Sequence, residues 1–248
     1  SVDIDLDFTE NFSKEEIEKN KEIIKQRLIN FMWQENYSLL INPREHYALI
    51  SLTFSYVNNV GNRDNIKIEI NFMDRCHILP LENKKVLSKG IIDRFEILTL
   101  NTIELYASKI NALISRATPR DLYDVNAMIE NDIILDKETL RKCLIFYNMV
   151  GGEQDIDNLT FENIEKINFI KFKTQLKPTL SKNDEFDYEK AKVKVIKYLK
   201  ELIKINEKEK IFINEFRNHN YKPEILFDSI SIVNNIKSHP MALWRCKN

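Results

Sequence analysis

The chain has 248 residues, of which 43% are hydrophobic and 30% are charged, and its formal net charge is -1. This is the composition of an ordinary globular protein, and it carries no global basic field of the kind that marks nucleic-acid binding, although a local basic groove stays open. No run approaches the ~18–20 apolar residues of a membrane span, so no membrane partner is expected. Cys76, Cys143 and Cys246 are scattered, which favours free thiols and a cytoplasmic location.

The opening segment, SVDIDLDF, alternates acidic and apolar residues, which is the pattern of a β-strand. Asp3, Asp5 and Asp7 then share one face, and we expect the apolar residues between them to bury the other. Three like charges on one face repel one another. This face is therefore either washed by water or occupied by a cation.

The next segments predict a helix and a β-hairpin. Ser13 with Glu16 forms the sequence pattern of a capping box at the start of SKEEIEKNKEIIKQRLINFMW. The apolar residues at helical spacing in this segment are Ile17, Ile24, Leu28 and Phe31. YALISLTFSYV and IKIEINF each alternate around the turn NNVGNRDN, which predicts a hairpin with one half-buried face. Lys67, Glu69 and Asn71 share the polar face of its second strand.

The character of the sequence changes near residue 100. FEILTL (95–100) predicts another strand, and helical patterns then continue to the end of the chain. Asn101 with Glu104 predicts a second capping box, and Thr118 with Pro119 caps and opens a further helix. Strands followed by helices predict an α+β fold with a helical C-terminal half.

The acidic residues suggest a metal site. Asp3 and Asp5 form an Asp-x-Asp pair, and Glu69 lies on the polar face of a separate strand. If these strands are neighbours, three carboxylates lie on one side of the sheet, and carboxylate oxygens suit Mg²⁺ or Mn²⁺. Two such ions can clamp an in-line phosphoryl displacement. A solvated acidic edge fits the pattern equally well, so the acids alone leave both interpretations open. The four histidines lack metal-ligand spacing, and we expect surface or capping roles for them.

A second cluster lies in ELYASKINALISRATPRDLYDV. Lys109 and Arg116 are two helical turns apart on one face, and Arg120, Asp121 and Asp124 follow on the next helix. Lysine and arginine suit the phosphate oxygens of a nucleoside triphosphate, an NTP. The alternative is a helix pair laced by ion pairs between the arginines and the aspartates.

The order of these pieces resembles the AbiEii-type nucleotidyltransferase family, the toxins of type IV toxin–antitoxin and abortive-infection systems. The resemblance is carried by SVDIDLDF, IKIEINF, the helix pair above and the C-terminal YKPEILFDSISIVNNIKSHPMALW. It implies a polymerase-β-like mixed sheet in a catalytic core, residues 1–100, followed by a helical domain, residues 101–248. It also implies transfer of a nucleoside monophosphate from an NTP to an RNA acceptor, tRNA, and a separately encoded antitoxin.

The resemblance assigns roles to the acids of the opening strand and the hairpin. Asp3 and Asp5 match the paired metal ligands for Mg²⁺ or Mn²⁺, and Glu69 matches the third acid, where the wider superfamily usually has Asp. A Gly-Ser turn precedes the Asp-x-Asp strand in that superfamily and grips the triphosphate. Since nothing precedes Ser1 here, we expect this turn to lie upstream in the intact protein.

The resemblance also assigns roles to the helix pair. Lys109 matches the family's lysine, on the triphosphate. Arg116 and Arg120 are further candidates for binding the nucleotide on the basis of the charge pattern of the helix pair. Asp121 matches another active-site acid. Two alternatives stay open: a catalytically degenerate nucleotidyltransferase fold that binds a nucleotide or a partner, and a two-metal nuclease, which shares the acids and does not need Lys109.

Overall fold

The computed structural model describes residues 2–40, 44–86, 95–151, 155–181 and 185–247. The chain forms two compact units, the first made of Ser1–His77 with Ser238–Met241 and the second of Ile78–Lys237 with Ala242–Asn248. These units separate after His77, whereas the sequence changes character near residue 100, because the strands at residues 82–99 group with the helices that follow them. The catalytic core over residues 1–100 stays a prediction.

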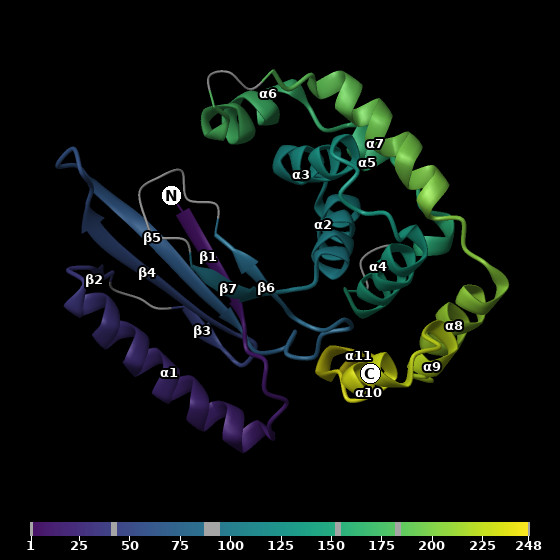
Figure 1. Ribbon diagram of the computed structural model, residues 1–248, viewed down its shortest axis with the longest axis horizontal. Helices are drawn as coiled ribbons and strands as arrows, with labels where there is room; N and C mark the ends of the chain where they lie inside the picture. Colours follow the sequence, from purple (N-terminus) through teal and green to yellow (C-terminus); the bar gives the residue numbers. More distant parts are fainter. Residues whose placement is uncertain (1, 41–43, 87–94, 152–154, 182–184, 248) are drawn as a thin grey trace. The chain divides into compact units, whose positions relative to one another are not determined.

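The first unit is built on a sheet whose strand order, among the described residues, is β1-β5-β4-β2, with β3 also paired to β4 (Figure 1). β1 and β5 are parallel, and the other pairs are antiparallel. The elements of this unit are β1 (Val2–Asp7), α1 (Lys14–Gln34), β2 (Ser38–Leu39), β3 (Arg44–His46), β4 (Leu49–Val57) and β5 (Arg63–Asn71).

Helix α1 packs on the apolar face of this sheet (Figure 1). Ser13 and Glu16 form the predicted capping box at its start. The core that α1 shares with the sheet contains Ile17, Met32, Ile50, Leu52, Phe54, Ile68, Ile70 and Phe72. The helical spacing was wrong for Phe31, whose side chain is 57% exposed, because its neighbour Met32 takes the buried position.

The hairpin of β4 and β5 is confirmed, with Ser51 opposite Glu69 in its register. The prediction that the opening strand buries its apolar face was wrong for Ile4 and Leu6, which are 38% and 47% exposed. β1 stands at the end of the strand order among the described residues, and the core under α1 is built on β4 and β5. The alternation therefore sets which residues share a face of β1, while the cover over that face depends on the neighbouring elements.

The second unit begins with an antiparallel ribbon of β6 (Glu82–Lys85) and β7 (Glu96–Thr99), and β7 confirms the strand predicted in FEILTL. The longer helices that follow are α2 (Thr102–Arg116), α3 (Pro119–Glu130), α4 (Lys137–Gly151), α7 (Tyr188–Leu202) and α8 (Glu207–Arg217). The short helices are α5 (Glu162–Glu165), α6 (Phe169–Lys171), α9 (Pro223–Leu226), α10 (Ile230–Ile236) and α11 (Pro240–Arg245), with 3₁₀ turns η1 (Ile156–Asn158) and η3 (Lys177–Thr179) and a π-helical turn η2 (Phe172–Leu176). This composition confirms the α+β class. In the described ranges, no helix has the length and apolar character needed to cross a membrane.

The start of α2 differs from the prediction. Asn101 caps the helix through its side chain, but Glu104 does not close a capping box with it. The Glu104 carboxylate is fully buried and accepts hydrogen bonds from the backbone N–H groups of Ile78 and Leu79, each at 2.8 Å, and from the Tyr147 hydroxyl at 2.6 Å. The Glu104 carboxylate therefore bonds to the distant N–H groups of residues 78–79 and not to the N-cap, and these bonds connect residues 78–79 to α2.

Candidate active site

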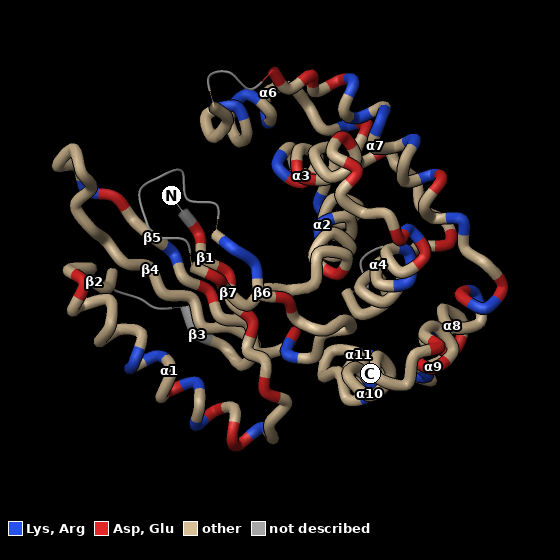
Figure 2. Tube along the Cα trace, viewed as in Figure 1, with Lys and Arg blue, Asp and Glu red and all other residues tan. Residues whose placement is uncertain are grey.

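The polar face of the first unit's sheet places Asp5 beside Glu69. The parallel register of β1 and β5 pairs Asp3 with Lys67 and Asp5 with Glu69. Residues paired in this way on neighbouring strands share a face and lie about 4.8 Å apart. The acidic positions of β1 are visible as red segments in Figure 2. The strands are therefore neighbours, which is the condition under which the three acids lie on one side of the sheet.

The carboxylates are not gathered around a common point. Glu69 is engaged by Lys67, whose Nζ lies 2.7 Å from Oε2, while Asp3 and Asp5 are exposed. Within the described part of the chain, no group of three or more potential ligands is arranged to hold a metal ion. The donor chemistry nevertheless fits Mg²⁺ or Mn²⁺, which bind through one or two carboxylates and retain water. Such an ion would compete with Lys67 for Glu69.

The second cluster centres on Asp121, in the first turn of α3. Its carboxylate is 2% exposed and accepts two hydrogen bonds from Arg116, Nε to Oδ2 at 2.8 Å and Nη2 to Oδ1 at 2.7 Å, and one from the Thr118 hydroxyl at 2.6 Å. Burial raises the pKa of Asp121, but the hydrogen bonds from Arg116 and Thr118, with the charges of Arg116 and Lys109, outweigh it and lower the pKa below its ordinary value. Asp121 is thus a fixed, ionised carboxylate at neutral pH.

The other charged residues of the helix pair have different partners. Lys109 Nζ donates to Asp124 Oδ2 at 2.8 Å, and both side chains are more than a third exposed. Arg120 donates from Nε to the backbone oxygen of Gln175 at 3.2 Å. The ion-pair alternative raised by the sequence therefore holds for one arginine, while Asp124 pairs with the lysine. These contacts do not test the triphosphate roles of Lys109 and Arg120.

The comparison with known families decides the identity. A sequence model described as nucleotidyl transferase AbiEii toxin of type IV toxin–antitoxin systems matches residues 1–197. The chain belongs to the AbiEii family. It is a nucleotidyltransferase toxin of the type IV class, and its family implies an NTP substrate and an antitoxin partner. No curated protein matches it.

The fold of this AbiEii chain is similar to that of MenT4, a nucleotidyltransferase toxin from Mycobacterium tuberculosis H37Rv. The TM-score is 0.56 at 15% sequence identity, over 82% of this chain and 67% of the MenT4 chain. At this identity the likeness concerns the fold, and it agrees with the mixed sheet and helical part predicted from the sequence.

Two contacts in the AbiEii site were not anticipated. Lys67 was placed on the polar face beside Glu69, but its ion pair was not predicted, although residues two apart on a strand point to the same side. The Thr118 hydroxyl on Asp121 has a local signal, since Thr-x-x-Asp is a capping pattern.

The expectation of a surface or capping role was wrong for His239. This side chain is fully buried, and burial, followed by the charges of His77 and Arg75, lowers its pKa to about 4. Its placement depends on long-range packing, because Ser238–Met241 groups with the first unit although it lies near the end of the chain. His239 is therefore a neutral core residue at physiological pH.

Proposed function

We propose that this AbiEii toxin transfers a nucleoside monophosphate from an NTP to an RNA acceptor, tRNA, in a reaction that depends on Mg²⁺ or Mn²⁺. The observation that supports this most directly is the register of Asp5 with Glu69, with Asp3 on the same polar face. Carboxylates on adjoining strands are suited to a hard divalent cation. The three unpaired cysteines support a cytoplasmic site of action, where thiols stay reduced.

In this proposal Asp3, Asp5 and Glu69 hold the divalent cation. When bound there, the ion neutralises phosphate charge and lowers the pKa of the acceptor hydroxyl. Glu69 has a second task, which is to accept the proton of that hydroxyl. In the structure the Glu69 carboxylate is paired with Lys67, so a bound ion or the acceptor hydroxyl would take the place of Lys67 at one of its oxygens.

The bond changes are those of a single displacement. The acceptor oxygen bonds to the α-phosphorus, the bond from that phosphorus to the bridging oxygen of the β-phosphate breaks, and pyrophosphate leaves. Lys109 stabilises the negative charge that grows on the pyrophosphate. Asp121 fixes the orientation of Arg116, and a guanidinium held in this way binds phosphate oxygens through directed hydrogen bonds. Arg120 is assigned to the same phosphates.

The experiment incubates the protein with total tRNA and each of the four NTPs, labelled either at the α- or at the γ-phosphate, with Mg²⁺ or with a chelator. Nucleotidyl transfer predicts α-label in the RNA with Mg²⁺, no γ-label, and no label with the chelator. Label in tRNA under these conditions also names the nucleotide.

Other outcomes would contradict the proposal in distinct ways. Shortened tRNA without incorporation would indicate the two-metal nuclease. NTP binding without transfer to any RNA would indicate the degenerate binding module. Incorporation of label in the presence of the chelator would contradict the metal dependence and would still support nucleotidyl transfer.

A further inference from the structure

We propose that a cleft in the second unit, walled by aromatic rings and rimmed by lysines, binds the single-stranded end of the RNA acceptor. The cleft has a volume of about 840 Å³, and its lining includes Phe169, Phe172, Phe186, Lys177 and Lys190; it is called the aromatic cleft below. The inference rests on the proposed function, because it names the surface that holds the RNA substrate of that reaction.

The aromatic rings form a continuous row that ends in solvent. The ring of Phe172 stacks on that of Tyr188, with centroids 5.1 Å apart and an interplanar angle of 28°, and it lies 6.1 Å from the ring of Phe186 and 5.6 Å from that of Phe169. Phe172 and Tyr188 are buried, whereas Phe169 is 60% exposed. A ring held from behind and open in front offers a face on which an unpaired base stacks, whatever its sequence.

The charge around the row suits a phosphate backbone. The described residues 166–181 contain four lysines and no aspartate or glutamate, in a chain whose net charge is -1, and one of the four, Lys166, pairs with Glu162. Lys171, Lys173 and Lys177 are exposed, and none has an ion-pair partner among the residues that the structure describes. Figure 2 shows lysine on α6, which belongs to this segment. Closely spaced cations beside a stacking surface are the combination that single-strand binding proteins use.

The lining of the cleft itself carries two lysines and two acidic residues. Asp187 is engaged at the start of α7, where its side chain accepts from the backbone N–H of Lys190 at 3.1 Å and pairs with Lys190 Nζ at 2.9 Å. The remaining charged residues of the lining are Lys177 and Glu185, and the exposed Lys171 and Lys173 lie on the same segment outside the lining. The excess of positive charge therefore comes from the segment beside the cleft.

The aromatic cleft is joined to the helix that carries Asp121. Arg120 on α3 donates to the Gln175 carbonyl in the π-helical turn η2, and the ring of Tyr123 on α3 meets that of Phe186 edge-on, with centroids 5.1 Å apart. π-Helical turns are rare and often occur at functional sites. RNA bound in the aromatic cleft is thus held by elements that are anchored to α3.

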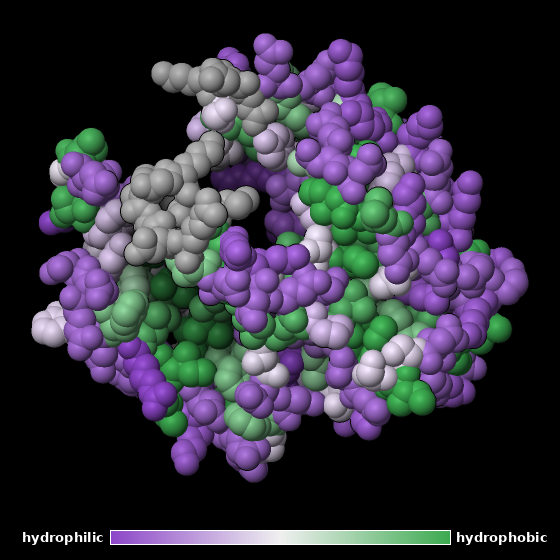
Figure 3. All heavy atoms as spheres, in the orientation of Figure 1, coloured by the Kyte–Doolittle hydropathy of each residue, from purple (hydrophilic) through white to green (hydrophobic). Residues whose placement is uncertain are grey.

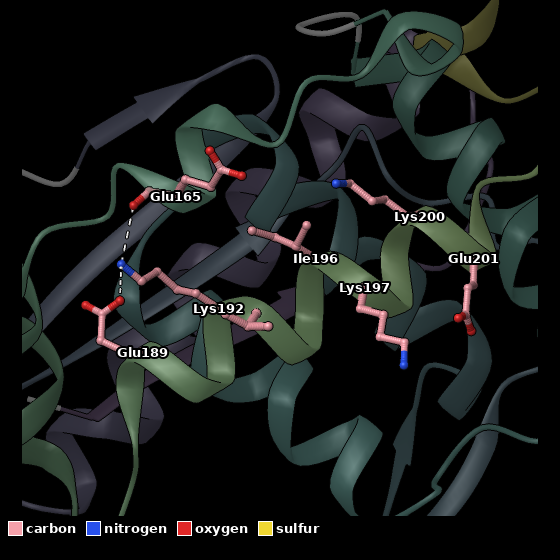
Figure 4. Close-up of a pocket in the computed structure, with 8 residues that line it drawn as sticks. Glu165, Glu189, Lys192, Ile196, Lys197, Lys200 and Glu201 are labelled. Carbon is pink, nitrogen blue, oxygen red and sulfur yellow. Dashed lines mark hydrogen bonds and ion pairs between the residues drawn. The ribbon is translucent and has the colours of Figure 1, made fainter.

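Within the part of the chain that the structure describes, the exposed apolar residues and the cavity along α7 lack this combination. Apolar residues are exposed at several places on the surface, among them Leu135, and green patches interrupt the hydrophilic face in Figure 3. A cavity of about 590 Å³ along α7 has three lysines, three glutamates and no aromatic ring in its lining (Figure 4). One of these lysines, Lys192, is engaged by Glu189 and by the Glu165 carbonyl. The α7 cavity therefore serves as a control surface.

The test measures binding of a fluorescein-labelled single-stranded RNA of about 12 nucleotides by anisotropy, over a range of salt concentrations. Phe169→Ala should weaken binding at least about fivefold, because a stacked base is lost. Lys173→Gln with Lys177→Gln should weaken binding and lower the slope of log K against log salt by about 1.4. The double variant Lys197→Gln and Lys200→Gln removes the same charge from the α7 cavity and should bind as the wild type does.

Transfer of label to tRNA, measured in parallel, separates this inference from the proposed function. If the wild type transfers nucleotide while Phe169→Ala keeps both its RNA affinity and its KM for tRNA, the aromatic cleft does not bind the RNA and the proposed function is unaffected. A second outcome is that the wild type transfers no nucleotide, while Phe169→Ala and the Lys173→Gln, Lys177→Gln double variant both weaken RNA binding. In that case RNA binding by the aromatic cleft is supported and the proposed function is wrong. RNA binding that is absent in the wild type, or unchanged in every cleft variant, would contradict RNA binding by the aromatic cleft. The cleft would then be a candidate site for a protein partner.

Discussion

Arg116 holds Asp121 by a two-pronged ion pair, with Nε 2.8 Å from Oδ2 and Nη2 2.7 Å from Oδ1. The carboxylate is buried, while the Arg116 side chain is 64% exposed. The contact closes the turn between α2 and α3 from the solvent side. Because Asp121 matches an active-site acid of the family and Arg116 is a candidate phosphate ligand, their structural and catalytic contributions need separate measurements.

Loss of the Arg116 guanidinium should destabilise the protein moderately. Arg116→Gln removes two charged hydrogen bonds from Asp121, and solvent screening limits the expected loss in free energy of unfolding to about 1–2 kcal/mol. Since the pKa of Asp121 is lowered in the folded state, this contribution is present above the ordinary aspartate pKa of about 4 and is lost as the pH falls through the lowered value. Urea unfolding at several pH values measures it.

Arg120→Gln is the matched control, since Arg120 makes one bond to a carbonyl at the surface. Arg120→Gln should lower the free energy of unfolding by less than about 0.5 kcal/mol. Equal losses in the two variants would show that the contact with Asp121 adds nothing to stability.

His239 should make stability depend on pH between about 4 and 6.5. An unfolded histidine takes up a proton near pH 6.5, whereas native His239 resists protonation until about pH 4. The unfolded state therefore binds more protons in this window, and stability is full above it and falls as the pH drops, by at most about 3–4 kcal/mol. His239→Asn should flatten this part of the urea-derived stability profile.

His219→Asn is the control for that profile. His219 is exposed and has a φ of 63°, a backbone conformation that asparagine tolerates well. This variant should keep the wild-type pH dependence. A His239→Asn protein with the same acid loss as the wild type would assign that loss to other groups.

Lys109 should matter for activity far more than for stability. Lys109→Met should slow nucleotidyl transfer at least about 100-fold, because the charge on the leaving group loses its stabiliser. The half-exposed pair with Asp124 contributes less than about 1 kcal/mol to folding. Transfer rates and urea midpoints are compared with those of Lys200→Met, an exposed lysine on α7. Activity within a few-fold of the wild type would remove Lys109 from the mechanism.

Glu104 should be among the residues of the second unit on which folding depends most. Glu104→Gln weakens the buried acceptor of two backbone N–H groups and one hydroxyl, at an expected cost of about 2–4 kcal/mol. Tyr147→Phe removes the hydroxyl alone and should cost about 1 kcal/mol. Urea unfolding of both variants checks the order, and a Glu104→Gln cost no larger than that of Tyr147→Phe would contradict it.

Alternation and capping patterns predicted the local elements of this chain well. The polar and apolar faces of IKIEINF, the Ser13 cap and the Pro119 start of α3 all depend on residues within a few positions of one another. Such patterns could not show that β1 pairs with β5, because that pairing joins Asp5 to Glu69, far along the chain. The patterns identified the candidate acids, but whether their strands are neighbours could be stated only as a condition.

Long-range partners explain the wrong predictions. Glu104 has the sequence of a capping residue, but backbone donors more than twenty positions earlier provide a stronger bond in a buried setting. Ile4 and Leu6 alternate as buried residues do, yet exposure depends on what lies over β1. Arg120 shows the same limit of local patterns, since only the structure brings the Gln175 carbonyl to it, while its predicted phosphate role stays a prediction.

The most direct test of the metal-dependent transfer is the rate of α-label incorporation into tRNA by Asp5→Asn beside Asp7→Asn. The two residues share a face of β1, both are exposed, and each substitution removes one charge, so folding effects should match. The expected result is that Asp5→Asn abolishes incorporation while Asp7→Asn keeps most of it. Full activity in Asp5→Asn, or equal loss in both variants, would contradict the assignment of Asp5 to the catalytic metal site.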